Sequence, residues 1–401
     1  MSFMKKAYLH TFGCKVNQYE TQLFRETLTR DGYVFSDNAN DADIIFVNTC
    51  TVTGEADRQC RQLLRRLLKK NATARILVSG CYAVRDKEEL RRISDRIEIV
   101  TARKSDDASS AAISEFSGHS RAFIKIQDGC DAFCSYCIVP HVRPVLWSRP
   151  VPEIVAEISS LAAKGYAEMV LSGIRLGKYV GGLPALLRTL LVLPGNFRLR
   201  LSSLEINEAG DDLVELMASE PDRICAHLHV PLQSGSDTVL KRMNRPYSSA
   251  QFAARLDRIR AVLPAAGIST DVIVGFPGET DLEFDATRGF IEENSFSRLH
   301  VFAFSPRSGT PAAGMPERPS PHTVSERSLV LRDIDARLQE KFWRRWIGTC
   351  RPAVREGSGQ TLLTDNYIRL ETDADSSGIS PSIMTVKIIE KNGKPWAIKT
   401  L

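Results

Sequence analysis

Short apolar runs alternate with amphipathic stretches over most of this chain, and this alternation constrains its fold more than any other feature. In the first hundred residues each run has the length of a strand, and each intervening stretch has the apolar spacing of a helix. Alternating strands and helices form parallel sheets, because each crossover helix returns the chain to the same end of the sheet. The region is therefore predicted to be a small parallel α/β sheet. Its expected strands are residues 7–11, 44–48, 76–79 and 97–100.

A second series of the same kind runs from residue 121 to about residue 322. Its six strand–helix units are too few to close an eight-stranded barrel, so we expect a partial (β/α)6 barrel. One expected helix, residues 280–294, carries Thr280 and Glu283 at the spacing of a capping box. The other expected helices are 151–164, 210–219 and 248–263, and the expected strands are 123–127, 168–172, 197–202, 227–231, 269–274 and 298–304.

The last part of the chain has a different pattern. A charged helical stretch at about 323–346 is followed by short strand-like runs that turn residues separate, and Asn392-Gly393 is a strong hairpin signal. These features predict a small antiparallel β-barrel. Between the first two series lies a stretch rich in Ser, Ala and Asp that is typical of a linker. We therefore divide the chain into 1–102, the linker 103–120, 121–337 and 338–401.

Composition excludes several classes of protein. The chain has 401 residues, of which 43% are hydrophobic and 25% charged, so it is neither disordered throughout nor collagen-like. Its apolar runs are shorter than the roughly 20 residues that a membrane-spanning helix needs. The first residues, MSFMKKAYLHTFGC, lack the apolar core of a signal peptide, so we expect a cytoplasmic protein without a membrane partner. The net charge of +5 is compatible with a polyanionic partner.

Three of the nine cysteines form one dense cluster. Cys130, Cys134 and Cys137 make a C-x3-C-x2-C array directly after the first expected barrel strand, where the active sites of barrels lie. Thiolates at short spacing suit zinc or iron–sulfur centres. A set of three leaves one iron of a [4Fe–4S] cluster without a protein ligand and open to a substrate or cofactor. The alternative is a structural zinc site with His141 as the fourth ligand.

Three further cysteines each follow an expected strand of the first sheet. Cys14, Cys50 and Cys81 end the segments YLHTFGC, IIFVNTC and ILVSGC. Because the carboxyl ends of parallel strands share one edge, these thiols should converge there, and we expect a second metal cluster. The alternative is three unrelated buried cysteines. No metal role is expected for the remaining three, Cys60, Cys225 and Cys350.

The central array, with Tyr136 before its last cysteine, resembles the cluster motif of radical S-adenosylmethionine (SAM) enzymes. In that family SAM binds the open iron and yields a 5′-deoxyadenosyl radical, while the protein supplies orientation and excludes water. The segments VLSGIRLG, LSSLEI, HLHVPLQSGS and DVIVGFPGET match the family in order, although VLSGIRLG departs from the usual Gly-Gly-Glu form. The resemblance implies SAM contacts from Tyr136, Gly173, Ser202, Ser203, Glu205, Gln233, Gly275, Pro277 and Gly278.

Nearly the whole chain resembles the radical SAM methylthiotransferases. The matching segments include TFGCKVNQYET, VNTCTVT, SGCYA, CSYCIVP, PLQSGS, IVGFPGET and FSPRSGTPA. The resemblance implies two [4Fe–4S] clusters, of which the second supplies or carries sulfur, and a TRAM-like RNA-binding module at 338–401. It also implies an electron donor and a sulfur source as partners. The chain departs from the family in that Pro144, not glycine, follows Arg143, and Arg175 stands where relatives often carry His or Asn.

The family is divided by substrate. TFGCKVNQYET and SGIRLGKY are most similar to the branch that methylthiolates C2 of N6-threonylcarbamoyladenosine, next to the anticodon in tRNA. The branches that act on N6-isopentenyladenosine or on a ribosomal-protein aspartate are the alternatives. The threonylcarbamoyl carboxylate calls for a cation, and Arg143 and Arg175 are the candidates. Either arginine could instead pair with a local carboxylate or with SAM.

Two regions have the charge expected of an RNA-binding surface. Residues 58–75 carry seven basic and no acidic side chains, and residues 338–401 have a net charge of +3. An ordinary solvated helix face explains the first region equally well. Trp343, Trp346, Tyr367 and Trp396 could stack on bases, but such aromatics are more often core residues. Two functions from other classes also remain: a radical SAM enzyme with another outcome, such as methyl transfer or a carbon–sulfur bond in a peptide, and a non-catalytic iron–sulfur or zinc protein that binds RNA.

Overall fold

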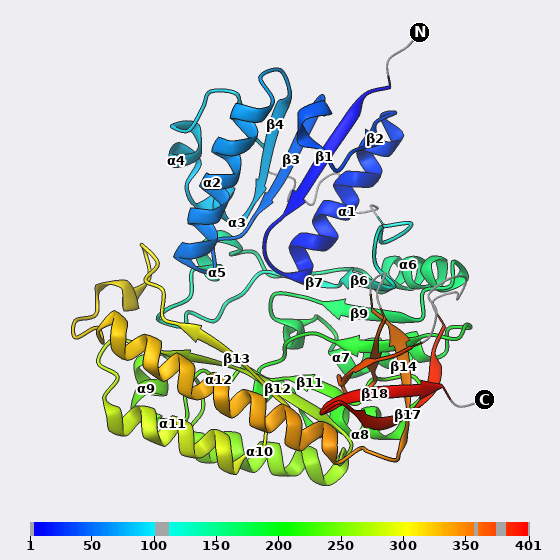
Figure 1. The fold of residues 1–401 in the computed structure, drawn as a ribbon, viewed down its shortest axis with the longest axis vertical. Helices are drawn as coiled ribbons and strands as arrows, with labels where there is room; N and C mark the ends of the chain where they lie inside the picture. Colours follow the sequence, from blue (N-terminus) through cyan, green and yellow to red (C-terminus); the bar gives the residue numbers. More distant parts are fainter. Residues whose placement is uncertain (1–3, 101–111, 357–359, 374–381, 400–401) are drawn as a thin grey trace. The chain divides into compact units, whose positions relative to one another are not determined.

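The computed structural model describes residues 4–100, 112–356, 360–373 and 382–399 (Figure 1). The chain forms two compact units, and each takes residues from separate parts of the sequence. The first unit contains residues 1–117, 128–147 and 305–310, and the second contains residues 118–127, 148–304 and 311–401. Of the expected linker 103–120, residues 103–111 lie outside the described part. Among the described residues, no helix is both long enough and apolar enough to cross a membrane.

The first unit is built on a parallel sheet, as the alternation predicts. Its strand order is β2-β1-β3-β4-β5, and every neighbouring pair is parallel. The sequence pattern did not show β2, which has only two residues. The strands are β1 Lys6–Thr11, β2 Val34–Phe35, β3 Ile44–Thr49, β4 Arg75–Gly80 and β5 Ile97–Ile99.

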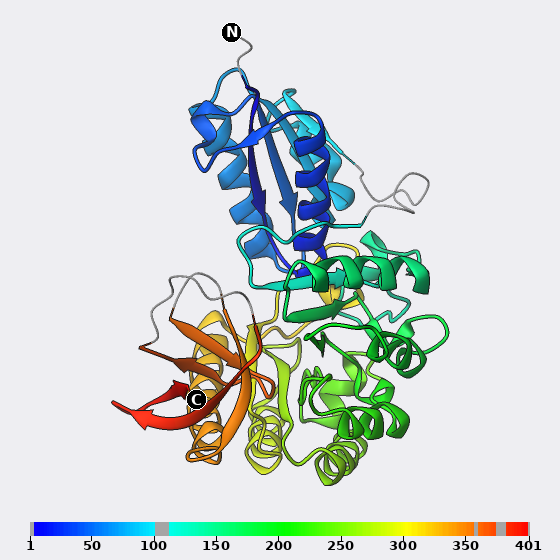
Figure 2. The same ribbon diagram turned by 90° about the vertical axis from the view of Figure 1, so that its right-hand side faces the viewer.

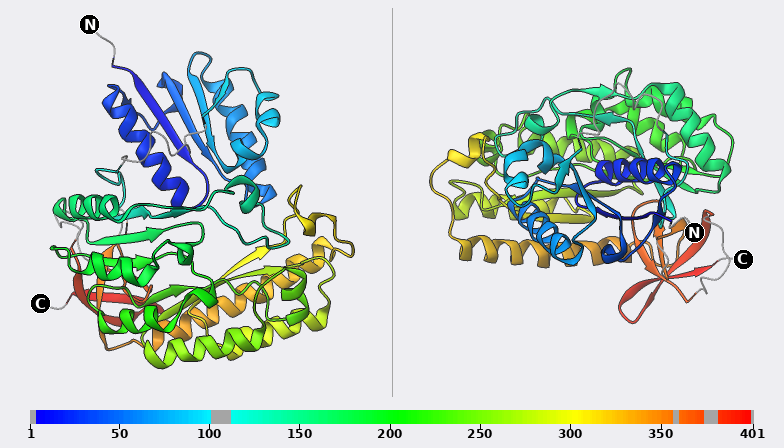
Figure 3. Two further views of the ribbon diagram at one scale, coloured as in Figure 1. Left: turned by 180° about the vertical axis from the view of Figure 1, so that it is seen from behind. Right: turned by 90° about the horizontal axis from the view of Figure 1, so that it is seen from above.

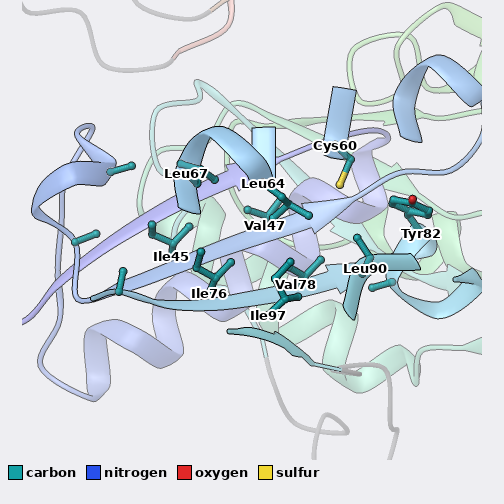
Figure 4. Close-up of a cluster of buried hydrophobic side chains, with 14 residues drawn as sticks. Ile45, Val47, Cys60, Leu64, Leu67, Ile76, Val78, Tyr82, Leu90 and Ile97 are labelled. Carbon is teal, nitrogen blue, oxygen red and sulfur yellow. The ribbon is translucent and has the colours of Figure 1, made fainter. Parts of the chain in front are cut away.

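Helices cover both faces of this sheet because side chains of β3 alternate between them. Ile45 and Val47 pack with Leu64 and Leu67 of the helix α2 in one apolar cluster (Figure 4). Phe46 points to the other face, where a phenylalanine of α1 stacks on it at 4.0 Å between ring centroids. Figure 3 shows α1 and α2 on opposite sides of the strands. The helices are α1 Lys15–Arg30, η1 Ala39–Asp41, α2 Gly54–Lys70, α3 Cys81–Arg85 and α4 Lys87–Arg91.

The segment 128–147 also belongs to the first unit, although it follows the first barrel strand in sequence. It contains the short helix α5, Val139–Val142, and the strands β7 Gln127–Asp128 and β8 Trp147–Ser148 mark where the chain leaves and re-enters the second unit. Ile138 and Val142 pack against Cys81 of α3 in a small buried cluster. The C-x3-C-x2-C loop is thereby attached to the N-terminal sheet.

The second unit contains the expected partial barrel. Its six strands form two three-stranded parallel sheets, β6-β9-β10 and β11-β12-β13. Isolated parallel bridges, Leu199 with Ile224 and Ser203 with His229, connect the two sheets, so the six strands follow one another in chain order. The strands are β6 Arg121–Lys125, β9 Glu168–Ser172, β10 Arg198–Leu201, β11 His227–His229, β12 Gly267–Val274 and β13 Arg298–Ala303.

Local capping signals set the start of several helices of the second unit. Thr280 and Glu283 form the expected capping box at α11, and Ser248 and Gln251 form another at α10. These reciprocal bonds satisfy backbone N–H groups that the first turn leaves without partners. The helices are α6 Val151–Ala163, η2 Leu176–Lys178, α7 Leu183–Leu191, η3 Ile206–Glu208, α8 Asp211–Ser219, α9 Asp237–Arg242, α10 Ser249–Val262, α11 Asp281–Glu293 and η4 Pro311–Gly314.

After the long helix α12, Pro321–Arg344, the chain closes a small barrel in the order β14-β15-β16-β18-β17 (Figure 2). Asn392 and Gly393 form the expected hairpin, with φ of 55° and 72°. Four of the five pairings are antiparallel, but β16 pairs with β18 in parallel. The sequence pattern did not show β15. The strands are β14 Cys350–Arg355, β15 Thr361–Thr364, β16 Arg369–Glu371, β17 Met384–Lys391 and β18 Lys394–Lys399.

A buried ion cluster links this small barrel to the partial barrel. Glu168 is fully buried and accepts hydrogen bonds from Arg198 at 2.8 Å and Arg200 at 2.7 Å. Burial would raise the pKa of Glu168, but the two guanidinium groups lower it well below its usual value. Both arginines also donate to backbone carbonyls of the small barrel: Pro352, Leu363, Thr364 and Asp365. The two barrels therefore belong to one compact unit.

Candidate functional site

The structure brings Cys14, Cys50 and Cys81 to one edge of the N-terminal sheet. Cys14 caps α1 after β1, Cys50 directly follows β3, and Cys81 begins α3 directly after β4. The strand register aligns Thr11 with Asn48 and the last residue of β3 with the last residue of β4. Three thiols that lie far apart in sequence therefore occupy neighbouring strand ends.

Two glycines let the chain pack tightly at this edge. Gly13 and Gly80 each precede a cysteine, and each has a φ of +97°, a conformation that other residues rarely adopt. A Cβ atom on Gly13 would lie 2.7 Å from the Cβ of Cys50 and 3.0 Å from its sulfur. A Cβ atom on Gly80 would collide with the carbonyl oxygen of Thr49. Side chains at these positions would push the strand ends apart.

The three thiols are close enough to interact electrostatically. Burial, with smaller contributions from the thiols of Cys81 and Cys14, raises the pKa of Cys50 to about 12. The site is therefore unfavourable for bare thiolates unless a cation shares it. In the described part of the chain, no three His, Cys, Asp or Glu side chains surround a single position where one metal ion would bind. The thiols share an edge but do not surround a point.

The C-x3-C-x2-C loop is held by its own backbone. Cys134 is buried, Cys130 and Cys137 are half-buried, and all three are thiols. The N–H of Cys137 donates to the carbonyl oxygen of Cys134 at 3.0 Å, and the N–H of Cys130 donates to the carbonyl oxygen of Arg143 at 3.1 Å. His141, the fourth ligand of the zinc alternative, is exposed.

Arg143 is buried and paired with carboxylates. Its guanidinium donates to Asp128 at 2.7 Å, to Glu20 at 3.0 Å, to Asn17 at 3.0 Å and to the sulfur of Cys81 at 3.4 Å. Burial would lower the pKa of Arg143, but Glu20, Cys81 and Asp128 raise it well above its usual value. Of the roles considered for Arg143, the structure shows pairing with local carboxylates.

Arg175 is also paired with a carboxylate. It donates to Glu208 at 2.7 Å, and its backbone N–H donates to Gln127 at 2.7 Å. Its side chain keeps 17% of its surface exposed, whereas that of Arg143 keeps 1%. Arg175 is therefore the more accessible of the two candidate substrate cations.

Ser202 is the clearest ligand-binding candidate among the residues expected to contact SAM. It directly follows β10, only 8% of its surface is exposed, and its hydroxyl has no partner in the described part of the chain. A buried hydroxyl without a partner costs about 1–3 kcal/mol, so a polar ligand group is favoured there. Ser203 forms a bridge to β11, and Glu205 pairs with Arg245.

The remaining SAM candidates occupy tight turns. Gly275 has a φ of +73°, and a Cβ atom there would collide with Val324 of α12, so packing alone requires glycine at this position. Gly278 has a φ of +71° and an open side, while a Cβ atom on Gly173 would lie 2.9 Å from an oxygen of Gln127. Gln233 is a non-glycine residue at a φ of +70°, a strained conformation that is common at binding sites. Tyr136 is half-buried in the cysteine loop, and Pro277 lies between the two glycines of the last turn.

Two family models match the chain. Residues 6–102 match the family described as "Uncharacterized protein family UPF0004", and residues 124–291 match the Radical SAM superfamily. A relative from Thermotoga maritima, "Threonylcarbamoyladenosine tRNA methylthiotransferase MtaB", is 36% identical over 88% of this chain and 87% of its own length. The MtaB of Bacillus subtilis is 35% identical over 98% of this chain and 95% of its own. This chain belongs to the radical SAM methylthiotransferase family.

A relative with another name in this family is also similar. The "tRNA-2-methylthio-N(6)-dimethylallyladenosine synthase" of Anaeromyxobacter sp. (strain K) is 37% identical over 77% of this chain and 73% of its own length. Among solved structures, the radical SAM methyltransferase TsrM from Kitasatospora setae has a TM-score of 0.52 at 13% identity, covering 77% of this chain and 75% of that one. At this identity the likeness shows the radical SAM fold alone.

As a radical SAM methylthiotransferase, the chain is an enzyme that uses a [4Fe–4S] cluster and SAM. The residues present fit these groups. The C-x3-C-x2-C loop offers three soft thiols that would leave one iron of the cluster open, and Ser202 offers a buried hydroxyl without a partner in the described part of the chain.

Sequence reasoning missed a second group of residues at the edge that carries Cys50. Thr51 and Asp57 are buried, and Asp57 accepts from Arg85 at 2.6 Å and also from Arg307. Arg307 lies in the FSPRSGTPA segment, which the family resemblance had marked without a role. Asn17, three residues after Cys14, was also missed. The spacing offered no signal for these residues, because their partners lie far away in sequence.

Proposed function

We propose that this methylthiotransferase acts on tRNA and inserts a methylthio group at C2 of N6-threonylcarbamoyladenosine next to the anticodon. The observation that carries the proposal is the presence of two cysteine trios in one compact unit of the fold. The relatives named for threonylcarbamoyladenosine support the choice of base, since they match 87–98% of this chain, against 77–89% for the dimethylallyladenosine relatives.

The reaction explains why such a chain needs a radical. A C2–H bond of adenine is replaced by a C2–S bond, and that carbon is neither acidic nor electrophilic enough for polar attack. When bound, the cluster and SAM supply a 5′-deoxyadenosyl radical that takes a hydrogen atom from an unactivated C–H bond. Cys130, Cys134 and Cys137 would hold this cluster, with Ser202 and the neighbouring turns as SAM contacts.

The second trio, Cys14, Cys50 and Cys81, would hold the second cluster. Its donors are soft thiols, which favour iron–sulfur chemistry over hard cations. A cubane cluster is larger than one ion and holds its cysteines farther apart. Three thiols at neighbouring strand ends supply the soft donors that such a cluster needs. The methylthio sulfur would come through this second site, from a sulfur source that the enzyme needs as a partner.

Substrate recognition must be positional. Hydrogen abstraction requires the target carbon within a few ångströms of the radical, so the base has to leave the stack of the anticodon loop. The carboxylate of the threonylcarbamoyl group needs a cation. Arg143 pairs with two carboxylates and keeps 1% of its side-chain surface exposed, whereas Arg175 keeps 17% exposed. We therefore assign this contact to Arg175.

The test is mass spectrometry of tRNA nucleosides from cells that lack the gene, complemented with the wild-type chain or with a Cys134→Ala variant. We expect 2-methylthio-N6-threonylcarbamoyladenosine only with the wild-type chain. Conversion of the isopentenyl base alone would move the chain to the dimethylallyladenosine branch. Methylthiolation of a ribosomal protein with unmodified tRNA would overturn the RNA substrate altogether.

A further inference from the structure

Two buried polar residues, Asn17 and Arg143, contact the surroundings of both cysteine trios. We propose that they form a positioning pair that builds the second cluster site and ties it to the loop of the first. The proposal rests on the proposed function, because it takes Cys14, Cys50 and Cys81 as cluster ligands. Neither residue is a ligand itself.

Asn17 joins the ends of two strands that carry cysteines. Its surface is fully buried, and its side-chain N–H groups donate to the carbonyl oxygens of Phe12 at 2.9 Å and Thr49 at 3.0 Å. Phe12 lies two residues before Cys14, and Thr49 directly precedes Cys50. The amide oxygen of Asn17 lies 3.9 Å from the sulfur of Cys14. The same oxygen accepts a hydrogen bond at 3.0 Å from the guanidinium of Arg143. One amide group thus spans two members of the trio.

Arg143 contacts the third cysteine of this trio and also one cysteine of the other trio. Its Nε donates to the sulfur of Cys81 at 3.4 Å, and its carbonyl oxygen accepts from the N–H of Cys130 at 3.1 Å. One residue therefore contacts Cys81 with its side chain and Cys130 with its backbone. Since Asn17 is bonded to Arg143, the chain of contacts runs through both trios.

Two carboxylates hold the guanidinium in this orientation. Glu20 of α1 bonds both terminal nitrogens of Arg143 at 3.0 Å, and Asp128 bonds one of them at 2.7 Å. A guanidinium presents five N–H donors in a rigid plane, and here all three of its nitrogens donate hydrogen bonds. Lysine keeps the charge but not the plane, so it cannot reach the sulfur, the amide and both carboxylates together.

The arrangement has a consequence for the second cluster. Hydrogen bonds to cluster sulfurs help to set the reduction potential, and a cation beside a ligand thiolate favours the reduced state. Arg143 should therefore raise the potential of the cluster on Cys14, Cys50 and Cys81. It should also couple assembly of that cluster to docking of the segment 128–147.

The test uses full-length chain in which Cys130, Cys134 and Cys137 are alanine, so that only the second trio can bind iron. After anaerobic reconstitution this parent should hold about four irons and give the electron paramagnetic resonance signal of one reduced cluster. Arg143→Lys and Asn17→Asp are added separately. We expect each variant to lose most of that iron, and we expect the cluster that remains with lysine to be reduced at a lower potential than in the parent.

Arg96→Lys is the matched control. Arg96 belongs to the same unit and donates to the carbonyl oxygens of Asn71 and Ala74 at the opposite edge of the sheet. This variant should keep the iron content, spectrum and potential of the parent. Circular dichroism of the iron-free proteins should show the same fold for all variants.

The outcomes separate the two proposals. A parent that binds no iron would remove the second cluster and with it the proposed function. A parent with one cluster, together with unchanged iron, spectrum and potential in Arg143→Lys and Asn17→Asp, would overturn the positioning role alone. An iron-free Arg143→Lys chain that fails to fold would also overturn it, because the residue would then serve general stability.

Discussion

The two cysteine trios of this enzyme are built in opposite ways. One comes from a single loop, residues 130–137, whereas the other comes from three strand ends between residues 14 and 81. The first depends on the path of one short segment. The second exists only when a sheet has formed in the right register and glycines let its strand ends approach. A set of candidate ligands can thus be visible as a local motif or arise only from the fold, and mutations should disrupt the two kinds in different ways.

Substituting one cysteine of each trio should distinguish the roles of the two trios most strongly. Cys134→Ala should abolish both SAM cleavage and methylthiolation, because it would remove a proposed ligand of the cluster with the open iron. Cys50→Ala should abolish methylthiolation but leave SAM cleavage close to wild type. The measurement is release of 5′-deoxyadenosine, with tRNA nucleosides analysed in parallel.

The same measurements can also contradict this separation of roles. If both variants lost SAM cleavage equally, with unchanged circular dichroism, the trios would not have separate roles. Retained methylthiolation in Cys50→Ala would remove the second trio from the chemistry. Cys60→Ala is the matched control: Cys60 is also buried in the first unit and packs in the apolar cluster with Leu64 and Leu67 of α2, and no ligand role is expected for it.

Much of the fold could be predicted from the sequence because its signals are local. Both the strand 168–172 and the hairpin turn at Asn392 depend on neighbouring residues; the strand has the expected bounds, and the turn lies at the expected residues. The two-residue strand β2 is too short to leave a pattern. The parallel pairing of β16 with β18 is a property of barrel closure, and no local pattern encodes it.

For the candidate site, the sequence revealed the cysteines but not the residues that surround them. The cysteines were visible because their chemistry is rare and their positions repeat at strand ends. The partners of Arg143 were not, since Glu20 and Asn17 lie 123 and 126 residues away in sequence. The attachment of the segment 128–147 to the N-terminal unit also rests on such distant contacts. The arginine itself was noticed, but its surroundings decide between substrate binding and positioning.

A substitution at Gly80 should disrupt only the trio that the sheet brings together, Cys14, Cys50 and Cys81. Gly80→Ala places a Cβ atom against the backbone of β3, where Gly80 has a φ of +97°, so Cys81 must shift. We expect a loss of about 2–4 kcal/mol in the free energy of unfolding, from strain and overpacking together. The second cluster should be lost, while the loop at Cys130 should keep its cluster. Urea unfolding and iron analysis measure the two effects.

Gly32→Ala is the matched control for this prediction. Gly32 has a φ of +80°, but an added Cβ atom there would have no neighbour within 4 Å. Backbone strain alone should cost about 1 kcal/mol, with both clusters retained. Equal destabilisation and equal iron content in the two variants would show that strand spacing at Gly80 does not control the second trio.

The basic residues of α2 and of the C-terminal region also differ in how the fold treats them, and we expect a modest difference in their contribution to tRNA binding. The helix α2 carries a run of basic residues, and in the described part of the chain no carboxylate pairs with four of them: Arg65, Arg66, Lys69 and Lys70. Residues 338–401 show a similar excess in the sequence, but the fold pairs at least five of their ten cations with acids. Those pairs are Arg344 with Glu390, Arg351 with Asp365, Arg369 with Glu356, Lys391 with Asp373 and Lys394 with Glu371.

Unpaired cations give the stronger attraction for phosphates, so α2 should contribute more to tRNA affinity than the paired lysines of the barrel. Arg66→Gln combined with Lys70→Gln should weaken tRNA binding several-fold and reduce the salt dependence by roughly one unit of slope per lost phosphate contact. Lys391→Gln combined with Lys394→Gln is the matched comparison and should have a smaller effect. Deletion of the barrel would be a poorer test, because it would leave Arg198 and Arg200 without their carbonyl partners. If the barrel pair instead weakened binding more than the α2 pair, surface ion pairs would be opening to admit RNA, and the barrel would be the principal RNA module.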